Sequence, residues 1–179
     1  MPFIKTKIPD VVIFEPRIFT DERGYFFEIY NEKVFKEAGI DARFVQDNQS
    51  KSSYGVIRGL HFQKGEHAQA KLVRVLQGTV LDVAVDLRPH SETFGKHVAV
   101  ELSDVNNLQL FIPRGFAHGF SVLSKTAVFA YKCDNFYCKE SEGGINCTDP
   151  DLNIDWQVPL DSACLSEKDK ILPRMKECF

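Results

Sequence analysis

Four residues that could carry out chemistry together lie in three short stretches of the chain. RGLHFQ contains Arg58 and His61, KLVR begins with Lys71, and IPRGFAHGF contains His118. Such a set around one cavity favours an anionic ligand or developing negative charge. A histidine there could remove a proton beside a carbonyl near neutral pH. The ammonium group of Lys71 would then stabilise the enolate oxygen.

The spacing of these residues resembles the cupin pattern, in which one strand offers His-x-His, then Glu and Gly, and a second offers Pro-x-Gly-x-x-His. The stretch 113–118 matches the second motif, and His61 matches the first histidine of the other. Gln63 replaces the second histidine and Lys71 replaces the glutamate. Transition metals bind imidazole, carboxylate or thiolate groups, and a protonated lysine has no lone pair. The pattern therefore predicts a cupin barrel that uses no metal and no other cofactor.

Short stretches typical of β-strands, separated by turn residues, dominate the chain. Strands are expected at 24–29, 42–49, 56–63, 71–77, 79–87, 97–102, 109–112, 119–123 and 127–133. Apolar residues alternate along 79–87, which predicts a half-buried strand, and Gln77-Gly78 predicts a hairpin turn just before it. Short helices are expected at 31–38 and 166–171. The pattern predicts an all-β fold, a cupin-type antiparallel β-barrel (jelly roll) with small peripheral helices.

Length and composition narrow the class of protein. A chain of 179 residues suits one domain spanning 1–179, and its net charge of −3 argues against nucleic-acid binding. No apolar run is long enough to span a membrane, and the first residues lack the apolar core of a signal peptide, so a cytoplasmic protein is expected. The five cysteines form no CxxC pair and are expected to be free thiols.

Six stretches together closely resemble the dTDP-4-dehydrorhamnose 3,5-epimerase family. They are DERGYF, FVQDNQS, RGLHFQ, AQAKLVR, PRGFAHGF and DLNIDW, in the family's order over nearly the whole chain. The resemblance implies epimerisation of dTDP-4-dehydro-6-deoxy-D-glucose at C3 and C5 to dTDP-4-dehydro-L-rhamnose, in dTDP-L-rhamnose biosynthesis. It also implies a homodimer whose N-terminal strands are exchanged or packed between subunits. The alternatives are an epimerase of C3 or C5 alone on a related sugar, a metal-dependent cupin, and a non-catalytic sugar-nucleotide binding module.

The resemblance implies roles for individual residues. His61 matches the catalytic base, Tyr131 the acid and Lys71 the residue at the C4 oxygen. Asp169 matches the partner that orients His61, and Asp82 is the alternative partner because it lies on a strand of the same sheet region. The residues that fall near the family's contacts with sugar or nucleotide are Arg23, Phe26, Glu28, Gln46, Asn48, Arg58, His118 and Tyr137.

One strand must be irregular if these assignments are right. Strict alternation places Arg58 and His61 on opposite faces of a strand, although both are expected in the cavity. We therefore predict a bulge or kink at Gly59, because glycine within a strand often marks one. The pocket is expected inside the barrel, with the C-terminal segment folded back over the outside.

Overall fold

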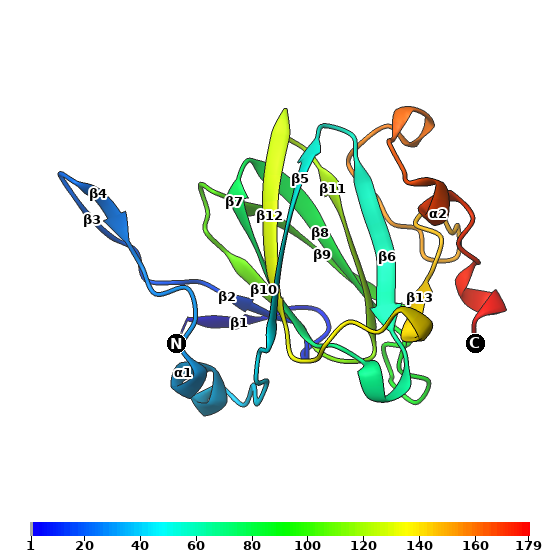
Figure 1. The fold of residues 1–179 in the computed structure, drawn as a ribbon, viewed down its shortest axis with the longest axis horizontal. Helices are drawn as coiled ribbons and strands as arrows, with labels where there is room; N and C mark the ends of the chain where they lie inside the picture. Colours follow the sequence, from blue (N-terminus) through cyan, green and yellow to red (C-terminus); the bar gives the residue numbers. More distant parts are fainter. Residues whose placement is uncertain (1) are drawn as a thin grey trace.

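The structure is a computed structural model that describes residues 2–179, and two antiparallel β-sheets facing each other form its body (Figure 1). The strands of the first sheet are, in order, β1 (Phe3–Lys5), β2 (Val12–Phe14), β10 (Gln109–Ile112), β7 (Lys71–Gln77), β12 (Thr126–Cys133) and β5 (Gln46–Ser53). Those of the second are β13 (Glu142–Gly144), β6 (Ile57–Gln63), β11 (Phe116–Val122), β8 (Thr79–Asp86) and β9 (His97–Ser103). The antiparallel jelly roll predicted from the sequence is confirmed, although over residues 2–179 no strand pairing joins the two sheets into a closed barrel.

The remaining elements lie at the edges of this body. A hairpin of β3 (Phe19–Asp21) and β4 (Gly24–Phe26) projects away from both sheets (Figure 1). The two α-helices, α1 (Glu32–Glu37) and α2 (Glu167–Lys170), are short, and both start where a helix was predicted, after the capping side chains of Asn31 and Ser166. No helix within the described residues is long and apolar enough to cross a membrane.

The junction at Gln77-Gly78 is not the hairpin turn that was predicted. Strand β7 pairs with β10 and β12, whereas β8 pairs with β11 and β9, so the chain crosses here from one sheet to the other. Gly78 has a φ of 82°, and a Cβ atom at this position would collide with the Thr126 carbonyl oxygen. Gly78 therefore allows the chain to pass tightly from one sheet to the other, which a residue with a side chain could not do here.

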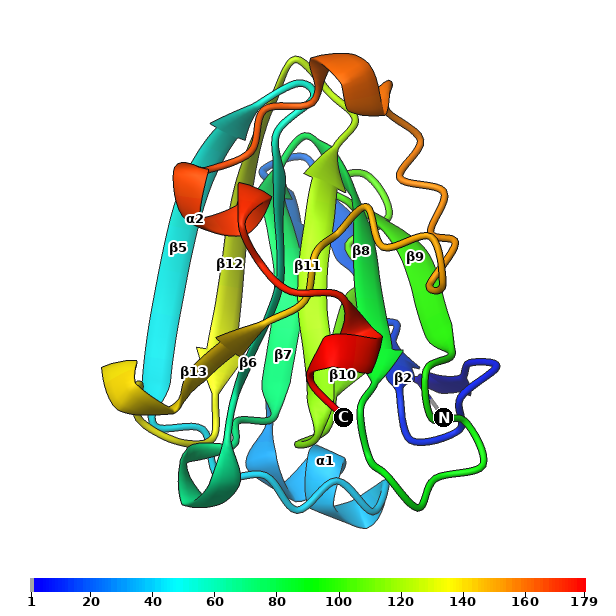
Figure 2. The ribbon, with the colours of Figure 1, turned by 90° about the vertical axis from the view of Figure 1, so that its right-hand side faces the viewer.

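Strand β8 is buried on both faces, so the prediction of a half-buried strand was wrong. Val80 and Ala84 pack between the two sheets, while Leu81 and Val83 belong to an outer cluster that includes Trp156. The C-terminal segment supplies this outer cover and crosses the second sheet (Figure 2). Its position confirms that the end of the chain folds back over the body.

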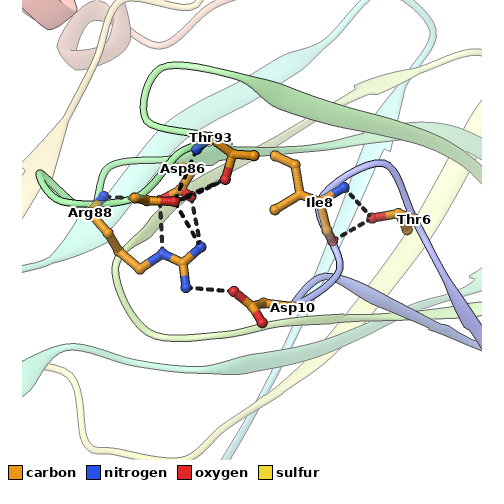
Figure 3. Close-up of polar contacts among 7 residues, drawn as sticks. Thr6, Ile8, Asp10, Asp86, Arg88 and Thr93 are labelled. Atoms are coloured by element: carbon orange, nitrogen blue, oxygen red, sulfur yellow. Dashed lines mark hydrogen bonds and ion pairs between the residues drawn. The ribbon is translucent and has the colours of Figure 1, made fainter.

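An ion-pair network fixes the N-terminal segment to the body (Figure 3). The buried carboxylate of Asp86 accepts hydrogen bonds from Arg88, Ser91 and Thr93, and Arg88 also pairs with Asp10 at 2.7 Å. Burial alone would raise the pKa of Asp86, but these hydrogen bonds outweigh it and hold the pKa well below its usual value. The N-terminal segment is therefore attached to the body of the protein at Asp10.

Candidate active site

A cavity of about 440 Å³ lies between the two sheets, within the usual size of a small-molecule site. Eight of the predicted site residues line it. They are Gln46, Asn48, Arg58, His61, Lys71, His118, Tyr131 and Tyr137. The structure therefore brings together residues that are up to 91 positions apart along the chain, as Gln46 and Tyr137 are.

The two walls of the cavity carry different chemical groups. His61 and His118 lie opposite each other on the paired strands β6 and β11 of the second sheet. Lys71 and Tyr131 lie on β7 and β12 of the first sheet. A planar intermediate between the walls would meet an imidazole on one side and a phenol on the other. That arrangement suits removal of a proton from one face and its return to the opposite face.

The irregularity predicted at Gly59 is present and brings Arg58 to the cavity. Arg58 pairs with Phe120 and His61 with His118, so the register shifts between the two pairs. Gly59 has a φ of 136°, and a Cβ atom there would lie 2.5 Å from the Gly119 backbone. The bulge therefore depends on close approach of two glycines, and it lets both predicted residues of β6 line one cavity.

His61 is bonded to the carboxylate that the sequence suggested. Its Nε2 lies 2.6 Å from Oδ1 of Asp169, which is buried in α2 and whose backbone N–H donates to the Ser166 hydroxyl oxygen. Burial alone would raise the pKa of Asp169, but the hydrogen bond and charge of His61 lower it below its usual value. The carboxylate holds one ring nitrogen of His61, so the other nitrogen of the neutral ring carries the lone pair.

Asp82, the alternative partner for His61, instead contacts His118. Its Oδ2 lies 2.9 Å from Nε2 of His118, and both side chains are buried. Burial lowers the pKa of His118, with Asp82 opposing the shift and Lys71 adding to it. Within residues 2–179, Oδ1 of Asp82 is the buried side-chain polar atom that has no hydrogen-bond partner. The floor of the cavity therefore holds a buried imidazole with a lowered pKa, beside a buried carboxyl group.

Lys71 and Tyr131 are suited to the roles of cation and acid. Burial lowers the pKa of Lys71, and the charges of Cys133 and Asp82 oppose that shift. Its ammonium group lies 5.8 Å from the centre of the Tyr131 ring. Burial raises the pKa of Tyr131, so the phenol keeps its proton at neutral pH, as an acid must.

The residues at the cupin metal-ligand positions do not fit a metal ion. Lys71 offers an ammonium group, and the carbonyl oxygen of Gln63 accepts a hydrogen bond from the Cys138 backbone at 2.9 Å. His61 and His118 are each held by a carboxylate. Residues 2–179 also contain no cluster of three or more His, Cys, Asp or Glu side chains placed to hold a metal.

Glu142 and its ion-pair partner Lys168 were not among the residues predicted from the sequence. Glu142 lines the cavity and accepts a hydrogen bond from the Tyr137 hydroxyl at 3.1 Å. Lys168 forms an ion pair with Glu142, and this bond, opposed by burial, lowers the pKa of Glu142. Neither residue lies in a recognisable motif; the one available signal was that Lys168 adjoins Asp169.

Of the other four predicted site residues, Asp169 reaches the cavity through its hydrogen bond to His61, and three lie outside the cavity. Arg23 and Phe26 are on the projecting hairpin, where Phe26 is 71% exposed and Arg23 pairs with Asp21. Glu28 follows the hairpin and accepts a hydrogen bond from Asn31. Within one chain, these side chains do not meet the residues that line the cavity.

Comparison with known proteins identifies close relatives. The sequence model of the family described as dTDP-4-dehydrorhamnose 3,5-epimerase matches residues 5–177. A relative of that name from Shigella flexneri is 58% identical over 170 residues, which cover 94% of this chain and 93% of the relative. The structure of such an epimerase from Elizabethkingia anophelis matches with a TM-score of 0.95 at 62% identity, covering 98% of this chain and 96% of that one. A dTDP-6-deoxy-D-glucose-3,5-epimerase from Legionella pneumophila, solved with dTDP-4-keto-L-rhamnose, matches with a TM-score of 0.93 at 50% identity, covering 97% and 92%.

Proposed function

This chain belongs to the dTDP-4-dehydrorhamnose 3,5-epimerase family, and we propose that its cavity converts dTDP-4-dehydro-6-deoxy-D-glucose to dTDP-4-dehydro-L-rhamnose by inverting C3 and C5. The enzyme is an isomerase of dTDP-L-rhamnose biosynthesis. The observation that carries this function is the placement of His61 and Tyr131 on facing sheets with Lys71 in the same cavity.

The first half of each inversion is proton removal. His61 takes the proton from the carbon beside the C4 ketone, and the electrons of that C–H bond move to form an enolate. Asp169 stabilises the imidazolium that results, since it is ionised and 2.6 Å from the ring. Lys71 stabilises the negative charge that develops on the C4 oxygen. Its ammonium group has no hydrogen-bond partner among residues 2–179, so its donors are available to the substrate.

The second half is proton return from the other wall. Tyr131 gives its hydroxyl proton to the opposite face of the same carbon, which inverts that centre and restores the ketone. His61 then releases its proton and Tyr131 regains one, so the enzyme is unchanged. C3 and C5 both flank C4, so the same groups serve each carbon after the sugar shifts.

The polar residues farther along the cavity would bind the nucleotide. Arg58 is held through its Nε by Ser52 at 3.0 Å, which leaves the terminal nitrogens of the guanidinium for a diphosphate. Gln46 and Asn48 offer amide groups on the edge strand β5. The ring of Tyr137 offers an aromatic surface for the base.

We further propose that the enzyme is a homodimer in which the hairpin of one copy completes the cavity of the other. The support is the hairpin itself, which exposes Phe19, Tyr25 and Phe26 to solvent and carries Arg23 away from its own cavity. Sedimentation at micromolar concentration should give a dimer; a monomer would refute this proposal. We also propose a cytoplasmic location, which the five free cysteines support because such thiols persist in a reducing compartment.

Turnover in deuterated water tests the reaction. The wild-type enzyme should incorporate deuterium at both C3 and C5 of dTDP-4-dehydro-6-deoxy-D-glucose. Tyr131→Phe should still exchange the abstracted proton but should fail to invert, because the base remains and the acid is lost. Deuterium at one carbon alone would indicate an epimerase of that carbon, and inversion without deuterium incorporation would refute proton abstraction.

A further inference from the structure

The loop that carries Tyr137 is held by glutamine side chains. It follows β12 and has no strand or helix of its own between Asp134 and Tyr137. The Gln46 carbonyl accepts the Tyr137 backbone N–H at 3.0 Å, and that of Gln63 accepts the Cys138 N–H at 2.9 Å. Successive N–H groups of a loop are thus paired by side-chain acceptors in place of a neighbouring strand.

The two acceptors come from opposite walls of the cavity. Gln46 is the first residue of β5 in the first sheet, and Gln63 is the last residue of β6 in the second sheet. Both side chains also line the cavity. The loop therefore spans the gap between the sheets and is attached to each of them beside the site.

Tyr137 is also held at the other end of its side chain. Its hydroxyl donates to Glu142 at 3.1 Å, and Glu142 is paired with Lys168. Tyr137 is 53% exposed, so packing alone does not fix the position of its ring. Hydrogen bonds at the backbone and at the hydroxyl together determine where the aromatic surface lies.

We propose that Gln63 and Gln46 are positioning residues that hold Tyr137 as a preformed wall for the nucleotide part of the substrate. Gln63 occupies the position where the cupin pattern has a metal-binding histidine. In this chain the side-chain carbonyl of Gln63 instead accepts a hydrogen bond from the loop that carries Tyr137. A position that binds a metal ion in the cupin pattern therefore holds part of the substrate-binding wall here. The inference rests on the proposed function, because it takes the ligand at this wall to be a nucleotide.

A double-mutant cycle tests the connection between Gln63 and Tyr137. Gln63→Met keeps the length of the side chain but removes the acceptor, so KM and the Kd for dTDP should each rise roughly fivefold, with kcat changed less than about twofold. Tyr137→Ala should raise the same two constants. In the double variant, Gln63→Met should add almost nothing to the effect of Tyr137→Ala, since the residue it positions is gone.

Gln77→Met is the matched control, because Gln77 ends β7, the next strand along the chain, is exposed and does not line the cavity. It should leave KM and Kd unchanged. Denaturant unfolding of each variant reports whether the fold is intact. The proposal is overturned if the effects of the two substitutions multiply in the double variant, or if Gln63→Met lowers kcat and leaves KM alone. The Kd for dTDP can be measured without turnover. If the wild-type protein binds dTDP but does not epimerise the sugar, the proposed reaction is refuted, and the double-mutant cycle on Kd still tests whether Gln63 positions Tyr137.

Discussion

Two histidine–aspartate pairs lie in one cavity, and their surroundings differ. His61 and Asp169 are 2.6 Å apart near the opening, where the His61 side chain is 33% exposed. His118 and Asp82 are 2.9 Å apart at the floor, where the exposed fractions are 7% and 0%. The histidine of the His61–Asp169 pair is therefore accessible to water, whereas the His118–Asp82 pair is shielded from it.

This difference in exposure separates a base from a fixed polar group. A base must lose its proton to solvent after each turnover, and only the His61 pair has access to water. His118 is kept neutral because burial lowers its pKa, and it can serve only as a hydrogen-bonding surface for the sugar. Residue identity alone would have given both pairs the same role.

The largest expected effect comes from replacing each histidine by asparagine. His61→Asn should lower kcat by roughly a thousandfold or more, because no other base can reach the same proton. It should also abolish exchange of the substrate's α-protons with deuterated water. His118→Asn should reduce kcat by roughly tenfold and preserve exchange. Equal losses of exchange in the two variants would contradict the separation of roles.

Replacement of the cation that lines the same cavity, Lys71, should have the next largest effect. Lys71→Met keeps the apolar stem but removes the charge, and kcat should fall by roughly a hundredfold with a much smaller change in KM. Steady-state kinetics distinguish this from an anchoring role. A large rise in KM with normal kcat would make Lys71 a substrate or phosphate anchor, and the oxyanion role would pass to Arg58 or His118.

Replacement of Asp169 should lower kcat more than replacement of Asp82, as replacement of His61 should lower it more than replacement of His118. Asp169→Asn removes the charge that stabilises the imidazolium of His61, so kcat should fall by roughly ten- to a hundredfold. Asp82→Asn also removes a charge, but from a pair that does not cycle its proton, so kcat should fall less than about tenfold. Parallel kcat measurements on the two variants make the comparison. A larger loss in Asp82→Asn would place the proton-cycling pair at the floor.

The smallest effect concerns stability against pH. The folded pKa of His118 lies below its ordinary value of 6.5, so the unfolded chain binds the proton first as the pH falls. Stability should therefore decrease as the pH falls below about 6.5, and His118→Asn should flatten this slope. Denaturant unfolding between about pH 7.5 and 5 measures it. Asp169 has its pKa lowered from 3.8, so its contribution is lost only in stronger acid and serves as an internal contrast.

Much of the site could be predicted from the sequence because its spacing follows from strand geometry. Strand β7 begins at Lys71 and ends at Gln77, as expected, and this places the cation at the end of a known element. The kink at Gly59 was predictable because a regular strand would place Arg58 and His61 on opposite faces, although both were expected in the cavity. Strand β5 begins at Gln46, four residues later than the predicted start, because its residues are polar on both faces and show no apolar alternation.

What could not be predicted depends on partners far away in the sequence. Gln77-Gly78 has the local composition of a hairpin, and only pairing with distant strands makes it a crossing between sheets. The alternation in β8 predicted a solvent face, but a segment some 70 residues later covers it, including Trp156. Glu142 begins the three-residue strand β13 and Lys168 lies in the four-residue helix α2, and such short elements have no periodicity to mark the direction of a side chain.

The projecting hairpin has a genetic consequence on the proposed dimer. Each working site would draw Arg23 from one copy and His61 from the other. A chain with Arg23→Ala and a chain with His61→Asn would each be inactive alone. In a mixed dimer, however, both lesions fall in one site and the second site is intact, so random pairing of equal amounts restores about a quarter of all sites. Two defective alleles can therefore complement each other, which two lesions in a site built from a single chain cannot do.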